Sequence, residues 1–182
     1  MKNLVIIDPG HGGSDPGAQG RIFKEKELNL WIALRVKDLL EELGRNVLLT
    51  REIDIYVPLY ERVIFANEKR ATAFVSIHHN AFSEPSSSGW EIFYYKGSGE
   101  GRRLARSIAS QFKIKVPLKR RGIKNDKKFY VLKKTICPAV LVEVCFITNA
   151  EDERWIGEPA NRQMVAEAIA VGIDKWLERR IS

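Results

Sequence analysis

Short apolar runs that suit buried strands alternate with amphipathic segments along almost the whole chain. Apolar runs that end at Gly, Pro or polar residues predict strands, and apolar residues spaced three and four positions apart predict helices. The predicted strands are Leu4–Asp8, Asn46–Thr50, Ala73–Ala81, Trp90–Tyr95 and Pro138–Ile147. The predicted helices, with approximate ends, are Glu25–Leu43, Pro58–Arg70, Gly101–Phe112 and Ala160–Arg179.

This alternation predicts an α/β fold, because strands that are apolar on both faces need helices on both sides of their sheet. We expect a three-layer αβα sandwich around a twisted, mixed sheet that is mostly parallel. The chain contains no internal repeat and no dividing linker rich in Gly, Pro or Ser, and its 182 residues suit one domain. The sequence therefore predicts a single catalytic domain over residues 1–182.

The composition is that of an ordinary folded protein, with 45% hydrophobic and 29% charged residues, which excludes a disordered or fibrous chain. No apolar run approaches the roughly 20 residues of a membrane-spanning helix. The start, MKNLVII, has only four consecutive apolar residues before Asp8, whereas a secretory signal needs an apolar region of about 7–15 residues. We therefore expect no membrane-spanning segment and no signal peptide in this chain.

The net charge of +7 is concentrated in one part of the chain, Lys113–Lys134, which has ten Lys or Arg and one acidic residue. This basic segment could bind nucleic acid, attract another polyanion, or simply form a solvated face. Its only aromatic residues are Phe129 and Tyr130, and it has no recognised nucleic-acid-binding motif. We therefore expect no nucleic-acid partner.

Two cysteines, Cys137 and Cys145, stand eight residues apart beside or within one predicted strand. An extended chain would separate them by about 26 Å, whereas a disulfide requires roughly 4.4–6.8 Å between Cα atoms. The sequence therefore predicts two free thiols.

All three histidines of the chain fall where an α/β sheet binds ligands, beyond or at the carboxyl ends of strands. His11 follows the first strand, and His78 and His79 end the third. Histidines that converge at one sheet edge favour a metal site. Because neighbouring strand residues point to opposite faces, only one of His78 and His79 can readily face a given site.

Acidic residues near the same edge offer further candidates. Glu25 and Glu27 open the first long helix, although acids in a first turn are also explained by the helix dipole. Glu143 interrupts the apolar run AVLVEVCFI, where a buried charge is costly unless it is paired or lies beside a metal. Burial would raise its pKa toward the range of a general acid or base, unless a salt bridge makes it structural. Asp8 could orient a ligand imidazole or merely start the Pro-Gly turn.

Several motifs then occur in a characteristic order: VIIDPGHGGSDPGAQG, KEKELNL, TREIDIYVPLYERVIFAN, FVSIHHNA and RGIKNDKKFYVLKKTICPAVLVEVCFITNAED. Over about residues 3–178 the chain resembles the catalytic domain of the zinc-dependent N-acetylmuramoyl-L-alanine amidases of the amidase-3 type. These are peptidoglycan hydrolases found among bacterial autolysins, cell-separation and sporulation amidases, and phage endolysins. The resemblance implies cleavage of the amide between N-acetylmuramic acid and L-alanine by zinc-activated water.

The resemblance implies one Zn²⁺ held by His11, Glu25 and His78, with Glu143 as the catalytic base and acid. Two positions depart from the family pattern. His79 stands where the family usually has a small residue and would place a second imidazole near the site. Cys145 stands where the family usually has Gly and, two residues after Glu143, would share its face and narrow the pocket or bring a thiol near the zinc.

Weaker assignments follow from the same resemblance. Asn80, Arg62 and Asn67 are candidate substrate-binding residues, although Arg62 and Asn67 could only brace the sheet edge. We expect a monomer that acts on peptidoglycan at the bacterial cell wall, where the basic segment would draw in the acidic wall. The rival functions are a zinc peptidase that cleaves an ordinary peptide bond and a non-catalytic module that binds polyanions.

Overall fold

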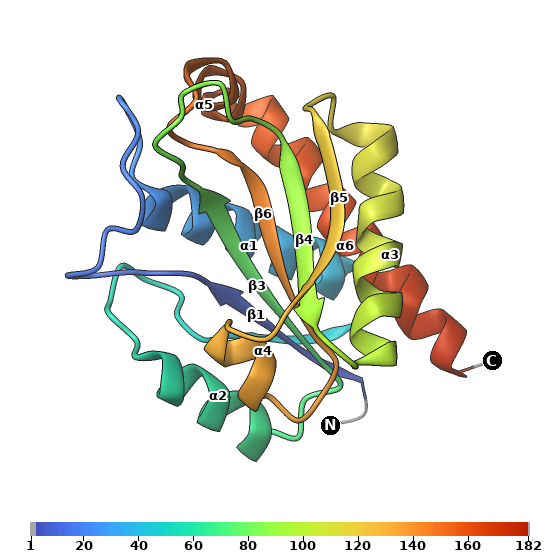
Figure 1. Ribbon diagram of the computed structural model, residues 1–182. Coiled ribbons are helices and arrows are strands. Elements are labelled where there is room, and N and C mark those ends of the chain that lie inside the picture. The colour runs from blue at the N-terminus through green and yellow to red at the C-terminus, as the bar shows by residue number, and fades with distance from the viewer. Residues whose placement is uncertain (1–2, 182) are drawn as a thin grey trace.

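A six-stranded sheet forms the centre of the computed structural model, which describes residues 3–181 (Figure 1). The strands are β1 (Leu4–Pro9), β2 (Asn46–Leu49), β3 (Ala73–Asn80), β4 (Trp90–Tyr95), β5 (Arg120–Asp126) and β6 (Ala139–Phe146). Their order across the sheet is β2-β1-β3-β6-β4-β5. Neighbouring strands are parallel except β4 and β6. Consequently the carboxyl ends of β1, β3 and β6 and the amino ends of β4 and β5 share one edge of the sheet.

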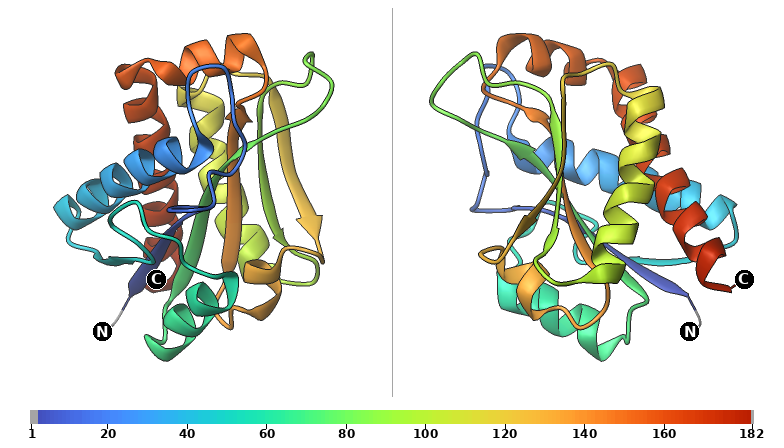
Figure 2. Two further views of the ribbon diagram at one scale, coloured as in Figure 1. Left: turned by 90° about the vertical axis from the view of Figure 1, so that its left-hand side faces the viewer. Right: turned by 45° about the vertical axis from the view of Figure 1, so that its right-hand side comes forward.

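The two faces of the sheet are covered unequally (Figure 2). One face packs against three long helices, α1 (Glu25–Glu42), α3 (Gly99–Lys115) and α6 (Pro159–Ile181), and buries the larger core cluster. The other face packs at one end against the shorter α2 (Leu59–Glu68) and α4 (Tyr130–Lys134). The half of this second face that lies at the carboxyl ends of β1, β3 and β6 is therefore left open. None of the helices between residues 3 and 181 is long and apolar enough to cross a membrane.

The predicted αβα sandwich with a mixed, mostly parallel sheet is confirmed, and every predicted strand and helix is present with ends shifted by a few residues. Three elements were missed: β5, α4 and α5 (Ala150–Gly157). Strand β5 lies within the basic segment, and charged residues are common on edge strands. Helix α5 has a visible start signal, because the side chain of Asn149 accepts hydrogen bonds from the backbone N–H groups of Glu151 and Asp152.

A β-bulge in β6 changes the expected position of Cys145. His78 pairs with Glu143 but Asn80 pairs with Phe146, so two steps along β3 match three along β6. Cys145 is consequently buried in the core cluster beneath the long helices. The expectation that it shares a face with Glu143 is wrong, and burial raises the pKa of this thiol well above its usual value. Both cysteines are free, as predicted.

Candidate functional site

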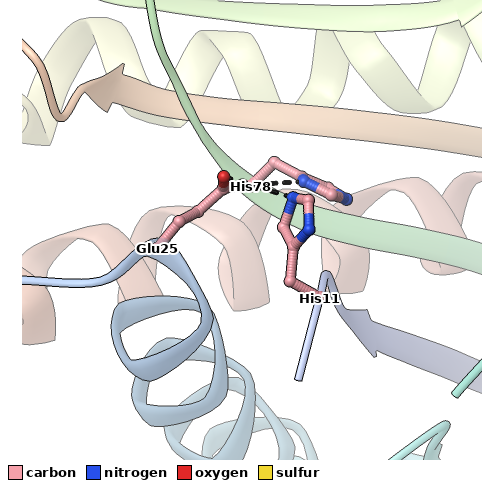
Figure 3. A group of neighbouring side chains, drawn as sticks. All are labelled: His11, Glu25 and His78. Carbon is pink, nitrogen blue, oxygen red and sulfur yellow. Dashed lines mark hydrogen bonds and ion pairs between the residues drawn. The ribbon is translucent and has the colours of Figure 1, made fainter. Parts of the chain in front are cut away.

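Three side chains from separate elements converge at the open half of the second sheet face (Figure 3). His11 follows β1, Glu25 is the first residue of α1, and His78 lies in β3. One ligand atom from each of the three lies within 4.8 Å of the other two. Glu25 Oε2 is 3.2 Å from His11 Nε2, and Glu25 Oε1 is 2.8 Å from His78 Nδ1. The two imidazoles meet edge to face, with ring centroids 5.0 Å apart.

The structure separates the two pairs of neighbours that the strand and helix patterns left open. Glu27 is exposed and accepts a hydrogen bond from the backbone N–H of Lys24 at 3.4 Å, so it caps α1. His79 is buried, and its Nδ1 lies 2.8 Å from Oδ1 of Asn29 in α1. Burial lowers the pKa of His79 to about 4, which keeps this imidazole neutral at pH 7. The cluster therefore contains Glu25 and not Glu27, and His78 and not His79.

Backbone groups hold the Glu25 carboxylate in place. The N–H of Ala18 donates to its Oε2 at 2.8 Å, and the N–H of His79 donates to its Oε1 at 3.0 Å. Burial alone would raise the pKa of Glu25, but hydrogen bonds and charges from His11 and His78 outweigh burial and hold this pKa far below its usual range. The carboxylate is therefore ionised and available as a metal ligand.

Asp15 orients the first imidazole. Its Oδ2 lies 2.8 Å from His11 Nδ1, which leaves Nε2 directed at Glu25, as in metal sites where a carboxylate fixes the ligand tautomer. Burial alone would lower the pKa of His11, but Glu25 and Asp15 outweigh it and raise this pKa. The sequence offered Asp8 as the residue that orients a ligand imidazole, but in the structure Asp15 contacts the imidazole of His11.

Two glycines allow the chain to approach the cluster closely. A Cβ added at Gly10 would lie 2.2 Å from His78 Cε1, and one at Gly17 would lie 2.6 Å from Glu25 Oε2. Gly17 also has a φ of +65°, and His11 itself has a φ of 59°, a region that side chains other than Gly rarely adopt. Such strain is typical of functional sites.

The donor set fits a zinc ion. Two imidazole nitrogens and one carboxylate oxygen are ordinary zinc ligands, and catalytic zinc sites typically have three protein ligands and one open position. Within residues 3–181, His11, Glu25 and His78 form the only group of three closely spaced His, Cys, Asp or Glu side chains that could hold a metal ion.

Glu143 lies directly beside this cluster, because it is the partner of His78 across β3 and β6. It is 8% exposed, and within residues 3–181 its Oε2 has no hydrogen-bond partner. Burial, together with the negative charges of Glu25 and Glu91, raises the pKa of Glu143 well above its usual value. A carboxyl group with a raised pKa holds a proton more readily than an ordinary carboxylate, as a general acid or base requires.

Arg62 braces the turn that carries His11. It is 2% exposed and donates to Asp8 Oδ1 at 2.7 Å, to the carbonyl of Pro9 at 2.8 Å and to the carbonyl of His11 at 2.9 Å. Burial alone would raise the pKa of Asp8, but the charge of Arg62 and hydrogen bonds to the carboxylate lower it. Arg62 therefore braces the sheet edge, one of the two roles that the sequence left open for it.

The cluster and Glu143 line a cavity of about 480 Å³, called here the main cavity. Two of the three candidate substrate-binding residues, Asn80 and Arg62, also line it. The third, Asn67, is elsewhere: its Oδ1 accepts from the backbone N–H of Ile136 at 2.9 Å and its Nδ2 donates to the carbonyl of Lys134 at 3.2 Å. The structure therefore leaves Asn67 outside the cavity as a brace of the loop before β6.

Sequence reasoning missed a second buried carboxylate beside Glu143. Glu91 is the antiparallel partner of Glu143 across β4 and β6 and is 4% exposed. Arg121 Nε donates to its Oε2 at 2.9 Å, and Lys124 Nζ donates to the same oxygen. The signal was present in the sequence, because Glu91 interrupts the apolar run WEIFYY much as Glu143 interrupts its own.

Comparisons with known proteins agree with this architecture. The family profile described as N-acetylmuramoyl-L-alanine amidase matches residues 5–175. The uncharacterized protein YqiI of Bacillus subtilis is 40% identical over 178 residues, covering 96% of this chain and 85% of YqiI. The amidase AmiA of Escherichia coli is 34% identical over 218 residues, covering 94% of this chain and 75% of AmiA.

The fold of this chain also matches that of a solved amidase structure. The N-acetylmuramoyl-L-alanine amidase AmiC2 of Nostoc punctiforme superposes with a TM-score of 0.93 at 41% sequence identity, and the match covers 98% of this chain and 99% of that one. With the profile match over residues 5–175, this similarity places the chain in the family of N-acetylmuramoyl-L-alanine amidases.

Proposed function

We propose that this amidase hydrolyses the bond between N-acetylmuramic acid and L-alanine in peptidoglycan, with one Zn²⁺ held by His11, Glu25 and His78. The observation that supports the proposal most strongly is the placement of three ligand atoms within 4.8 Å of one another beside Glu143 in the main cavity. The site thus combines a set of zinc ligands with a carboxyl group of raised pKa.

Glu143 carries the proton in the proposed reaction. When bound, Zn²⁺ supplies Lewis-acid chemistry, lowering the pKa of water to about 7 and polarising a carbonyl oxygen. Glu143 accepts a proton from the water that attacks the lactyl carbonyl and returns it to the departing amine of L-alanine. Its Oε2, unpartnered among the described residues, is free for both transfers. The products are a glycan strand and a free stem peptide.

We propose further that the chain acts as a single domain and a monomer at the bacterial cell wall. The positive charge of the basic segment supports a wall substrate, which carries stem-peptide carboxylates and teichoic phosphates. Much of this charge lies on or beside β5 and α4, next to the open half of the sheet face. Nucleic acid is not a proposed partner.

Digestion of purified peptidoglycan tests the proposal. The zinc-loaded enzyme should release stem peptides whose new amino terminus, identified by mass spectrometry, is L-alanine. A new terminus at a later stem residue would instead show a peptidase.

Chelation gives the control for the metal. Removal of zinc should abolish cleavage, and added Zn²⁺ should restore it. A protein that binds peptidoglycan equally well with or without chelator and releases nothing would be a binding module rather than an enzyme. Substitution of the ligand His78→Ala should abolish stoichiometric zinc binding, as measured by metal analysis.

A further inference from the structure

The main cavity continues past Glu143 into a second cavity of about 430 Å³, called here the outer cavity. The two cavities share Asn80, Phe129 and Glu143 as lining residues. The outer cavity is also lined by Glu91 and Arg121. It therefore begins at the proposed proton carrier and extends away from the cluster of His11, Glu25 and His78.

The sheet register aligns the groups that join the two cavities. His78 of β3 pairs with Glu143 of β6, Glu143 pairs with Glu91 of β4, and Glu91 pairs with Gly122 of β5. Paired residues point to the same face, and neighbouring strands lie about 4.8 Å apart. These four paired residues form a row across the sheet. The row ends in open space, because a Cβ added at Gly122 would have no atom within 4 Å.

A bulge places Arg121 at the end of this row. Trp90 pairs with Arg120 but Glu91 pairs with Gly122, so Arg121 is the extra residue of β5. Its guanidinium lies over the ring of Phe146, 4.8 Å from the centroid, while its Nε donates to Glu91 Oε2 at 2.9 Å. The side chain is thus fixed in position although it is 30% exposed.

Glu91 contacts two cations, of which Arg121 lines the outer cavity and Lys124 lies over the ring of Phe93, another lining residue. Arg121 and Lys124 both contact Oε2 of Glu91, while Oε1 accepts a hydrogen bond from Asn80 Nδ2 at 2.8 Å. Two cations therefore face one carboxylate. For the Nη groups of Arg121 the structure of residues 3–181 gives no hydrogen-bond acceptor. A guanidinium with free N–H groups binds a second carboxylate well, because its planar donors match the two oxygens.

The proposed reaction sets which part of the substrate reaches this cavity. The departing amine of L-alanine takes its proton from Glu143, so it lies at the boundary between the two cavities. The next stem residue, D-glutamate, is joined through its side-chain carboxyl and keeps an α-carboxylate, which some walls carry as a carboxamide. A peptide that continues along the row from Glu143 brings this group toward Arg121.

We propose that Arg121, assisted by Lys124, binds the α-carboxylate of the second stem-peptide residue and makes the enzyme prefer the free acid over the carboxamide. The inference rests on the proposed function and adds a substrate preference to it. Glu91 acts as a positioning residue that fixes both cations. Asn80 links this arrangement to the strand of His78.

Soluble glycan strands whose stem peptides carry either D-glutamate or its α-carboxamide test the inference. The wild-type enzyme should cleave the free acid with the higher kcat/KM. The substitution Arg121→Gln should lower kcat/KM for the free acid about 10–100-fold, the value of a hydrogen bond to a charged group. The same variant should change kcat/KM for the carboxamide less than about 3-fold, and Lys124→Gln should show the same pattern more weakly.

Arg120→Gln is the matched control. It removes the same charge from the neighbouring, exposed residue, which pairs with Trp90 and not with Glu91, and it should leave both substrates unaffected. A variant Arg121→Gln that loses equal activity on both substrates would overturn the inference and show a structural role. A wild-type enzyme with equal kcat/KM for the free acid and the carboxamide would also overturn the inference. A wild-type enzyme that releases no L-alanine terminus from either substrate would overturn the proposed function itself.

Discussion

Two buried carboxyl groups on the same sheet face differ in almost every contact. Asp8 is 1% exposed and accepts hydrogen bonds from Thr50 at 2.6 Å, Ser76 at 2.7 Å and Arg62 at 2.7 Å. Glu143 is 8% exposed, and its Oε2 has no partner in the described part of the chain. The first carboxyl group is fully bonded, and the second is not.

The difference supports the proposed division of roles, in which Asp8 is a structural carboxyl group and Glu143 carries the proton. Partners lower the pKa of Asp8 against the effect of burial, whereas burial and neighbouring negative charges raise the pKa of Glu143. A fixed anion suits a turn that must hold His11 in position. A carboxyl group with few partners suits proton transfer.

The largest expected effect follows from replacing the reactive group. Glu143→Gln keeps the shape of the side chain but removes its ability to accept a proton. The release of stem peptides should fall about 10²–10⁴-fold, the typical contribution of a general acid and base. Zinc content and the unfolding temperature of the zinc-loaded protein should stay close to those of the wild type. Cleavage at a near wild-type rate would show that another group carries the proton.

Replacing the structural group should affect stability first. Asp8→Asn leaves the buried guanidinium of Arg62 without its anion, which typically costs about 3–5 kcal/mol. Denaturant unfolding of the two proteins measures the difference.

The matched control is Asp54→Asn. Asp54 also pairs with a cation, Lys26 at 2.6 Å, but its side chain is 51% exposed, so the loss should be about 0–1 kcal/mol. Equal losses for Asp8→Asn and Asp54→Asn would contradict the structural role assigned to Asp8.

The two carboxyl groups should also give opposite dependence of stability on pH. The lowered pKa of Asp8 stabilises the fold above pH 3.8, the ordinary value, and this contribution is lost as the pH falls through the lowered pKa. The raised pKa of Glu143 acts in the reverse direction. Relative to its protonated state, the fold loses stability as the pH rises from 4.5 toward the raised pKa.

Urea unfolding of the metal-free protein between pH 3 and pH 8 measures both trends. The destabilisation caused by Asp8→Asn should shrink at the acidic end of this range. Glu143→Gln should instead become more stable than the wild type as the pH rises, because the amide never ionises. Parallel pH curves for wild type and Glu143→Gln would show that the pKa of Glu143 is not raised in the folded protein.

Glu143 and Asp8 also differ in how far the sequence predicts their roles. Glu143 could be singled out because one acid in a long apolar run has no ordinary structural reason. His11, Glu25 and His78 follow from motifs and strand ends, and the structure brings them together. The partners of Asp8 could not be predicted, since Thr50, Ser76 and Arg62 come from three separate parts of the chain and meet only through the sheet order.

Bulges account for two side-chain positions that the sequence did not predict. The strand pattern has period two, so one inserted residue reverses every side chain beyond it. The bulge before Phe146 moved Cys145 to the helix-covered face, and the bulge at Arg121 moved a basic residue into the outer cavity. Neither insertion has a signal in the periodicity. The fold class survives such local shifts because it depends on the order of apolar segments.

The smallest predicted effect concerns the charges around the reactive group. The basic segment contributes β5 and α4, at the side of the sheet where Glu143 lies, whereas Asp8 lies toward the opposite edge beyond β3. If this charge attracts the acidic wall, cleavage of intact walls should fall as salt rises, and more steeply than cleavage of a small soluble muropeptide. Lys127→Gln with Lys128→Gln, at two exposed positions, should flatten the salt dependence on walls only. Equal salt dependence for both substrates would reduce the segment to a solvated face and leave Arg121 and Lys124 as its only members with a proposed role in substrate binding.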